Sequence, residues 1–121
     1  MDGHILLMKT LADPTRMKLL KLVLREELCG CELQELLQIS QPAVSQHVAK
    51  LKHAALITER KAGMWTYYRG DADRLQTGLG ELSAFVATPP EAIPEMAELV
   101  ERRTRLNRAA MCADEKGERC K

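Results

Sequence analysis

Four cysteines are the side chains of this sequence best suited to binding a ligand chemically: Cys29, Cys31, Cys112 and Cys120. Cys29 and Cys31 stand where a helix is expected to begin, so free backbone amides and the positive end of the helix dipole favour the thiolate over the thiol. Thiolates are soft ligands, which select soft ions over magnesium or calcium. The pair therefore predicts a site for a thiophilic metal or metalloid.

The spacing of Cys29 and Cys31 limits how the two sulfurs could hold one ion. On a regular helix, side chains at i and i+2 point about 200° apart, whereas in an extended backbone they share a side. If both sulfurs coordinate, the segment is either extended before the helix or distorted on binding. A distorted segment would strain the helix that follows, and the site would then act as a switch.

Length and composition favour one globular domain without catalytic activity. The chain has 121 residues, 45% of them apolar, with Lys+Arg 18 against Asp+Glu 17 and a net charge of +1. No apolar run approaches the about 18 residues of a membrane span, and no basic-then-apolar leader opens the chain. We therefore expect a cytoplasmic protein with reduced cysteines and no membrane partner. No nucleophile–base–carboxylate set and no phosphate loop occurs, so we expect neither catalysis nor a resident cofactor.

The near-zero net charge hides a basic segment in the middle of the chain. Residues 41–70 carry five basic side chains and one acidic side chain, net +4, whereas residues 71–101 carry one basic and seven acidic side chains, net −6. A local excess of positive charge attracts phosphate. This distribution favours a nucleic-acid partner.

The expected elements are mostly helices, because only four aromatic residues occur and the core must be aliphatic. A short apolar helix covers residues 4–12. Asp13 and Pro14 then start a second helix, since Asp is a good N-cap and Pro is tolerated at the first helical position. Its predicted inward stripe is Met17, Leu20, Leu24 and Leu28, beside Leu19 and Val23, and its predicted exposed side is Arg16, Lys18, Lys21 and Arg25.

Two further helices follow. Leu33, Leu36 and Leu37 have the i, i+3, i+4 spacing of a short third helix, which should end near residue 38 or 39. Ser40 as N-cap and Pro42 in the first turn begin a fourth helix. Its predicted inward stripe is Val44, Val48, Leu51 and Ala55, and its outward face starts with Pro42, Ser45, Gln46 and Ala49.

From residue 57 the pattern changes to strands. Residues 57–60 and 65–69 are typical of two strands joined by a glycine turn over residues 61–64. Residues 71–86 return to helical spacing, prolines interrupt the chain after residue 88, and a charged helix covers residues 96–110. The predicted fold class is mainly α with a small β-hairpin (α+β). Residues 1–88 form one domain and residues 89–121 a C-terminal helix with a cysteine-containing tail.

This order of elements predicts a winged helix-turn-helix. The first residues of a helix in the major groove reach base edges, so we expect Gln46 to contact a base, and Ser45 and Gln41 to reach bases or phosphates. Basic side chains of the fourth helix and the hairpin suit phosphate, which positions a domain without reading sequence. The predicted DNA-binding set is Ser40, Gln41, Ser45, Gln46, His47, Lys50, Lys52, Arg60 and Lys61.

Three segments resemble the ArsR/SmtB family: Leu-Ala-Asp-Pro-Thr-Arg at residues 11–16, Glu-Leu-Cys-Gly-Cys-Glu-Leu at 27–33, and Ser-Gln-Pro-Ala-Val-Ser-Gln-His at 40–47. These bacterial winged-helix repressors release operator DNA when a metal or metalloid binds. The resemblance covers roughly residues 5–86. It implies a homodimer on a palindromic operator of double-stranded DNA, with the first and late helices in the dimer interface, so that the domain of residues 1–88 serves both DNA binding and dimerisation.

In the arsenic-sensing branch of the family, the cysteine segment resembles Cys-x-Cys-x-x-Cys, three thiolates for As(III). Here Gln34 stands at the third position and cannot replace a thiolate. We propose that Cys112 or Cys120, from the same or the partner subunit, supplies the third sulfur for As(III) or Sb(III). Cys29 and Cys31 alone would instead suit a methylated arsenical.

Other functions use the same residues. All four cysteines could hold cadmium, lead or zinc, and the thiols could respond to redox by forming a disulfide or polysulfide. A thiol oxidoreductase of another fold could use Cys29-Gly30-Cys31, but such enzymes need a βαβ scaffold, and no parallel strands are predicted. An arsenite- or antimonite-responsive repressor is the leading hypothesis.

Overall fold

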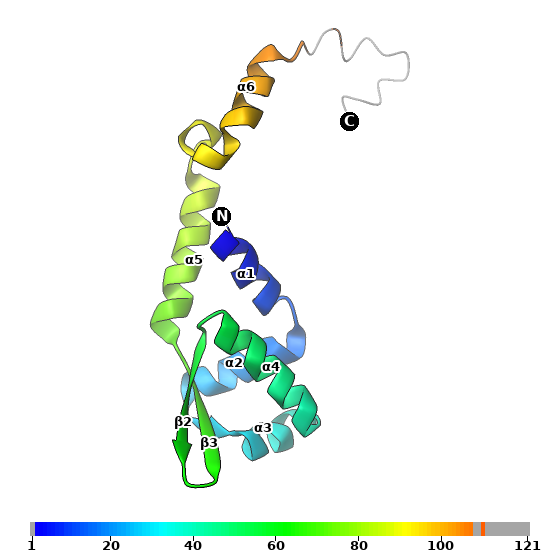
Figure 1. Ribbon diagram of the computed structural model, residues 1–121, viewed down its shortest axis with the longest axis vertical. Coiled ribbons are helices and arrows are strands. Elements are labelled where there is room, and N and C mark those ends of the chain that lie inside the picture. Colours follow the sequence, from blue (N-terminus) through cyan, green and yellow to red (C-terminus); the bar gives the residue numbers. More distant parts are fainter. Residues whose placement is uncertain (1, 108–109, 111–121) are drawn as a thin grey trace. The chain divides into compact units, whose positions relative to one another are not determined.

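Six α-helices and one small sheet make up the part of the chain that the computed structural model describes, residues 2–107 and residue 110. These residues divide between Ser83 and Ala84 into two compact units. The predicted fold class is confirmed (Figure 1). In chain order the elements are α1 (Asp2–Leu11), α2 (Pro14–Arg25), β1 (Leu28–Cys29), α3 (Gly30–Leu37), α4 (Gln41–His53), β2 (Ile57–Ala62), β3 (Trp65–Gly70), α5 (Ala72–Ala87), the 3-10 turns η1 (Pro90–Ala92) and η2 (Pro94–Met96), and α6 (Ala97–Arg105).

Two helices begin where capping residues predicted them. Asp13 caps α2, because its Oδ1 accepts a hydrogen bond from the backbone N–H of Arg16 at 2.9 Å, and Pro14 is the first helical residue. Ser40 caps α4, with its hydroxyl oxygen 3.3 Å from the backbone nitrogen of Ala43. Each cap gives a partner to an amide that the first helical turn leaves without one.

The buried face of α2 differs from the predicted stripe. Leu19, Leu20 and Val23 are buried, whereas Met17 is 47% exposed. The inward face is therefore the one that also carries residue 16. Arg16 was predicted on the exposed side, and this prediction is wrong, since Arg16 is only 5% exposed. The partners of its guanidinium, described below, are the reason.

Two other side chains predicted in the core lie outside it. Leu36 is 56% exposed, because the short helix α3 turns only Leu33 and Leu37 toward its neighbours. Ala55 lies beyond the end of α4, in a turn with φ +58°. Ala54 is buried in its place. Both errors come from extending a helical periodicity across a helix that is shorter than the pattern.

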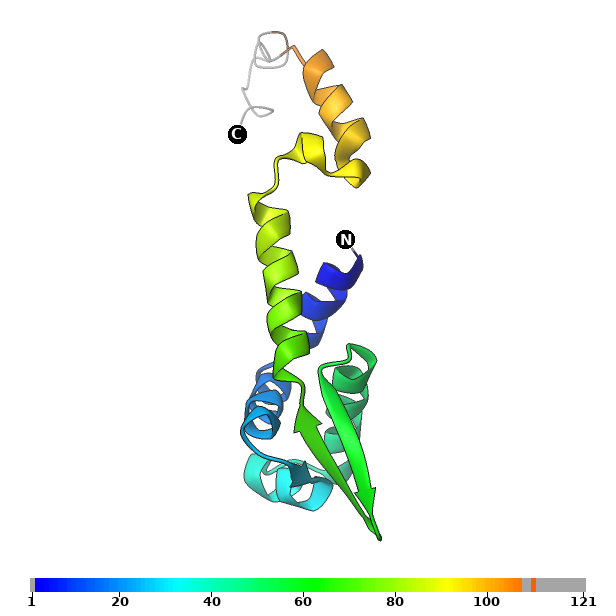
Figure 2. The same ribbon diagram turned by 90° about the vertical axis from the view of Figure 1, so that its left-hand side faces the viewer.

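The sheet contains a third strand that the sequence did not predict. Its strand order is β1-β3-β2, and both pairs are antiparallel. β1 pairs Leu28 with Tyr68 and Cys29 with Tyr67. Two residues are too short for a period-two pattern, so nothing in the sequence marked β1 as a strand. The strand attaches the cysteine segment to the hairpin (Figure 2).

The hairpin of β2 and β3, called the wing below, has a shorter turn than predicted. Ala62 pairs with Trp65, so β2 continues two residues past Arg60 and the turn contracts to Gly63 and Met64. Gly63 has φ +62°, a conformation that costs glycine nothing. The tip of the wing projects beyond α3 and α4 in both side views (Figures 1 and 2).

Gly70 ends β3 where the strand passes α2. A Cβ atom at this position would lie 2.6 Å from Cδ2 of Leu24 and 3.0 Å from its Cα. The second distance is to backbone, which cannot move aside without shifting α2. The strand can therefore approach α2 this closely only with glycine at its end.

The second compact unit holds η1, η2 and α6. The helix predicted over residues 96–110 is shorter, because α6 ends at Arg105 and Leu106 is extended. Beyond it, the Asn107 side-chain oxygen accepts from the N–H of Ala110 at 3.2 Å, a local bond that competes with helix continuation. Among the described helices, none has both the length and the apolar character that crossing a membrane requires.

Candidate nucleic-acid interface and thiol site

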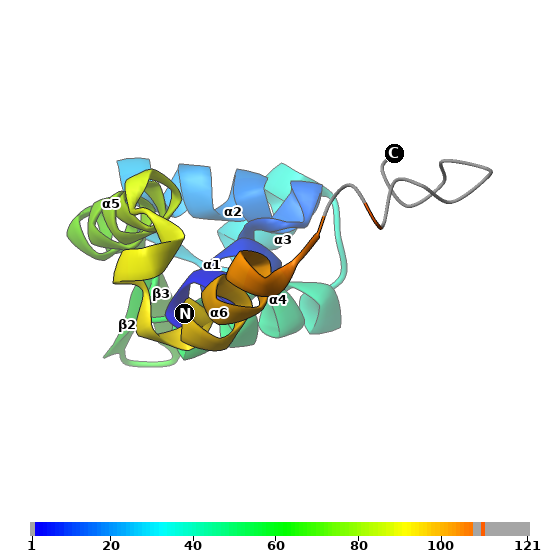
Figure 3. The same ribbon diagram turned by 90° about the horizontal axis from the view of Figure 1, so that it is seen from above.

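Helix α4 presents the predicted reading face to solvent. Val44, Val48 and Leu51 are buried and anchor the helix on the core. The opposite side, which includes Ser45 and Gln46, is exposed. The view from above separates α4 from α2 (Figure 3), so this outer face lies on the surface of the unit. A polar face of this kind on the second helix of a helix-turn-helix is suited to the major groove.

Two of the predicted reading residues form one polar unit. The Gln41 side-chain nitrogen donates to the Ser45 hydroxyl at 2.9 Å, and both residues are exposed in the first turns of α4. The bond holds both side chains in defined rotamers before DNA arrives. Gln46 lies beside this pair and is exposed, with its whole amide available for a base edge.

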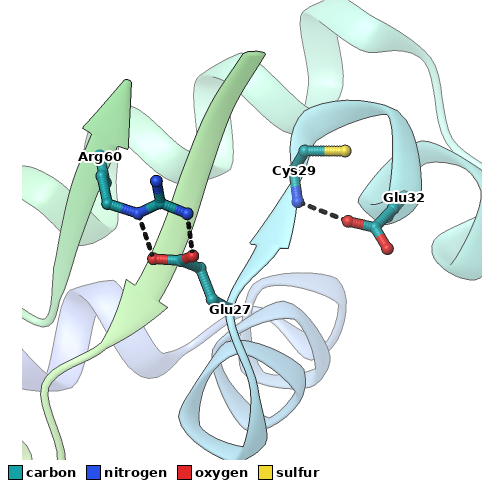
Figure 4. A network of polar contacts seen from close by, with 4 residues as sticks. All are labelled: Glu27, Cys29, Glu32 and Arg60. Carbon is teal, nitrogen blue, oxygen red and sulfur yellow. Dashed lines mark hydrogen bonds and ion pairs between the residues drawn. The ribbon is translucent and has the colours of Figure 1, made fainter. Parts of the chain in front are cut away.

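The structure places two predicted phosphate contacts in ion pairs. Arg60 makes a bidentate pair with Glu27 at 2.6 and 3.2 Å (Figure 4) and stacks 4.9 Å from the Tyr67 ring centroid. Lys52 pairs with Glu59 at 2.8 Å. Each partner cation lowers the pKa of its carboxyl group, mainly through the hydrogen bond, and Glu27 in turn raises the pKa of Arg60. Their charges are compensated locally, which weakens their attraction for a phosphate.

Lys50 and Lys61 keep uncompensated charge. Both are exposed, and neither forms an ion pair with any residue among 2–107 and 110. Lys50 lies on α4 and Lys61 near the end of β2, so they place positive charge on the reading helix and on the wing. Of the four basic residues predicted to contact phosphate, these two are the better placed.

Arg16 connects three helices from inside the protein, a role that the sequence analysis missed. Its Nε donates to the carbonyl oxygen of Thr10, and an Nη donates to the carbonyl oxygen of Lys9 at 3.4 Å. Both carbonyls belong to the last turn of α1, where no helical amide remains to bond them. A guanidinium has five donors, which is why one buried arginine can close the end of α1 and still bond elsewhere.

The remaining contact of Arg16 reaches the reading helix. Its Nη1 lies 3.2 Å from Nδ1 of His47 on α4. Because arginine only donates, this bond requires Nδ1 of His47 to accept. The backbone bond from Arg16, with the nearby charges of His47 and Arg16, lowers the pKa of Asp13. His47, predicted within the DNA-binding set, is half-buried and turned toward this network.

The two central thiols lie side by side in sequence but in different backbone conformations. Cys29 is buried in β1 and is the N-cap of α3, and Cys31 is exposed in the first helical turn. The Cys29 backbone N–H donates to Glu32 Oε1 at 2.9 Å (Figure 4). This bond, followed by one from the Cys29 side chain, lowers the pKa of Glu32. The segment is thus extended at the first cysteine and helical at the second.

The other two predicted ligands, Cys112 and Cys120, lie outside the described residues. Within the described ranges, no group of three histidine, cysteine, aspartate or glutamate side chains is arranged to hold a metal ion. Cys29 and Cys31 alone therefore supply two soft ligands, and a three-thiolate site needs a sulfur from elsewhere in the chain.

A pocket of about 240 Å³ opens beside the two thiols. Its walls come from three elements: the start of α3 with Cys29, Cys31 and Gln34, the first residue of α4, Gln41, and the wing. The wing contributes Met64, Trp65, Thr66 and Tyr68. The sequence signal was the clustering of three of four aromatics within residues 65–68, but their position beside the cysteines depends on β1 and could not be predicted.

Known proteins share both the sequence and the fold. The family model described as "Bacterial regulatory protein, arsR family" matches residues 13–59. Over 62 residues the chain is 48% identical to the arsenic resistance transcriptional regulator ArsR1 of Pseudomonas putida, covering 50% of this chain and 48% of that protein. Over 67 residues it is 46% identical to the arsenical resistance operon repressor of Escherichia coli K12, covering 54% of this chain and 56% of that protein.

A solved structure extends the similarity to nearly a whole relative. It is titled as a possible transcriptional regulator for arsenical resistance, with a TM-score of 0.59 and 31% identity over 79% of this chain and 94% of that one. The chain belongs to the ArsR family. The resemblance stated from the three sequence segments is confirmed. The family consists of DNA-binding transcriptional regulators. The ArsR-family chain spans about half the length of the two curated relatives that it matches.

Proposed function

We propose that this ArsR-family protein is a repressor that binds operator DNA through α4 and the wing and releases it when trivalent arsenic or antimony binds Cys29 and Cys31. One observation carries the proposal: the two thiols stand at the junction of both DNA-binding parts. Cys29 pairs with Tyr67 of the wing, and Cys31 belongs to α3, which packs against α4. Thiolates are the ligands that such soft elements prefer.

The donor set fits trivalent arsenic with one sulfur still to be supplied. Cys29 and Cys31 would bind two of three valences, and we propose that Cys112 or Cys120 of either subunit binds the third. A shift of α3 or β1 on binding would be felt by α4 and the wing, since the elements share the core around Leu33. The names of the two curated relatives, both concerned with arsenic resistance, agree with this effector class.

We further propose that the DNA-binding form is a homodimer. Leu7 of α1 packs against Gly78 of α5, where a Cβ atom would come within 3.1 Å of the leucine. On the same two helices Ile5, Met8 and Leu79 remain 40% or more exposed. A second copy would cover these apolar side chains and would place two reading helices on a palindromic operator.

The effector site is tested by replacing Cys31 with serine. Cys31 is exposed, so Cys31→Ser should fold and bind DNA as the wild type does, while arsenite should no longer release the DNA. The measurement is fluorescence anisotropy of a labelled operator duplex, selected from a random library, titrated with arsenite. Cys29→Ser should behave likewise once its folding has been checked by circular dichroism. Release by arsenite in both variants would show that the effector binds elsewhere.

The tail is tested by Cys112→Ser and Cys120→Ser in the same titration. Only the variant that removes the third sulfur should lose its response to arsenite. An unchanged response in both single variants and in the double variant would contradict a three-thiolate site.

The DNA interface is tested by comparing Gln46→Ala with Lys50→Ala. Loss of a bidentate base contact costs about 1–3 kcal/mol, so Gln46→Ala should bind the operator about 10- to 100-fold more weakly and bind unrelated duplex unchanged. Lys50→Ala should weaken binding to both duplexes and lower the slope of log K against log salt by about one unit. Equal binding by both variants and the wild type would show that α4 does not read the DNA.

A further inference from the structure

The wing forms one wall of the pocket beside the two thiols, and this wall is apolar where the rest of the wing is charged. Met64 is 99% exposed and Trp65 53% exposed, so both large side chains lie open to solvent at the hairpin tip. Their only described setting is the pocket that Cys29 and Cys31 also line. Large apolar side chains held beside a reactive group are suited to bury an apolar part of a ligand.

We infer that this pocket takes the organic substituent of a monosubstituted trivalent arsenical, R–As(OH)2, while Cys29 and Cys31 alone hold its arsenic. The inference rests on the proposed function, because it assigns a further class of effector to the same thiols.

Valence is the first argument. Each of the two thiols would give its proton to one arsenic-bound hydroxyl, so that two waters leave and two sulfur–arsenic bonds replace two oxygen–arsenic bonds. Arsenic stays trivalent and no oxidant is needed. The third valence is a carbon bond that needs no thiolate. This matches the described donor set, in which the residue three positions after Cys31 is Gln34, an amide on the same pocket wall.

Size and surface are the second argument. An apolar cavity of about 150 Å³ holds benzene, so the 240 Å³ here suffices for a methyl or a phenyl group. The indole of Trp65 and the thioether of Met64 are polarizable surfaces that make favourable contacts with an aromatic ring. Bare arsenite has only hydroxyl groups to place against this wall, and it gains nothing from these contacts.

Position is the third argument. The pocket is also lined by Gln41, the first residue of the reading helix, and Cys29 is paired through its backbone with Tyr67 in the middle of β3. A substituent in the pocket would therefore contact the wing, α3 and the start of α4 together. No tail cysteine is required for this arrangement.

The test titrates the full-length protein with phenylarsenite (phenylarsine oxide in water), methylarsenite and arsenite. Trp65 is the only tryptophan of the chain, so its fluorescence reports directly on the pocket. Phenylarsenite should quench or shift this emission at one equivalent. The Cys112→Ser/Cys120→Ser double variant should keep its affinity for phenylarsenite and lose affinity for arsenite.

Replacement of the pocket wall separates the substituent from the thiols. By calorimetry, Trp65→Thr should bind phenylarsenite about tenfold more weakly and arsenite as the wild type does, since only the ring loses its buried contact. Met64→Ser should act in the same direction, with Met17→Ser, also a replacement of an exposed methionine, as the matched control without effect.

The outcomes distinguish the two proposals. If arsenite binds and releases DNA but Trp65→Thr and the double tail variant bind phenylarsenite and arsenite in an unchanged ratio, the inference is overturned and the proposed function stands. If none of the three arsenicals binds the wild type, the proposed function fails and the inference fails with it.

Discussion

Replacing Arg16 with alanine should lower the free energy of unfolding by about 2–4 kcal/mol, because a hydrogen bond to a charged group contributes about 1.5–3 kcal/mol and the truncation leaves buried groups without partners. The carbonyl oxygen of Thr10 and Nδ1 of His47 would both lose their donor. Urea denaturation followed by circular dichroism measures the change. Lys18→Ala is the matched control on the same helix; Lys18 is exposed, so its loss should cost less than about 0.5 kcal/mol.

Arg16→Lys gives a second test of the same contacts. Lysine keeps the positive charge but lacks the planar fork that reaches α1 and α4 at once, so most of the stability should still be lost. The folded fraction of Arg16→Lys should also bind operator DNA more weakly, because His47 and with it α4 would no longer be held. If the Arg16→Ala and Lys18→Ala proteins proved equally stable, Arg16 would be a surface residue and the connection between α1 and α4 would be wrong.

Leu33→Ala should destabilise the protein by about 2–5 kcal/mol, the cost of removing a fully buried leucine and leaving a cavity. Leu33 is 0% exposed on α3, in the core that also anchors α2 and α4. Leu36→Ala is the matched control, since it makes the same chemical change one turn further along the same helix at a side chain that is 56% exposed. Its cost should stay below about 1 kcal/mol.

The ratio of these two costs decides between the structure and the periodicity. An i, i+3, i+4 pattern treats Leu33 and Leu36 alike, whereas the structure separates them. Equal destabilisation by Leu33→Ala and Leu36→Ala, measured by the same urea titration, would mean that α3 is rotated relative to the orientation described above. A second copy of the chain covering Leu36 would show instead as a dependence of its cost on protein concentration.

Features set by local chemistry could be predicted from the sequence. The caps Asp13 and Ser40 fix helix starts through bonds within three residues, and Gly63 fixes the hairpin turn. The side of α2 that is buried could not be predicted in this way. That helix is rich in leucine on more than one face, and the choice depends on which face meets the end of α1 and His47. Burial of Arg16 follows from those partners, which are distant in sequence.

The candidate site divides along the same line. The outer face of α4 and the thiol pair follow from spacing and residue type, and the exposed positions of Gln46 and Cys31 agree with those predictions. The pocket could not be predicted, because it forms only when the two-residue strand β1 brings residues 29–34 beside residues 64–68. The ion pairs that compensate Arg60 and Lys52 likewise need the three-dimensional positions of Glu27 and Glu59.

The pairing of Cys29 with Tyr67 has a consequence for protein engineering. Transplanting the hairpin of one ArsR-family protein onto another would exchange more than phosphate contacts, because residues 64–68 also line the space around the sulfurs. A chimera built to change the DNA target would thereby acquire a different ligand preference. Target choice and ligand choice are thus not separable modules in this protein, and designers of biosensors would have to select for both at once.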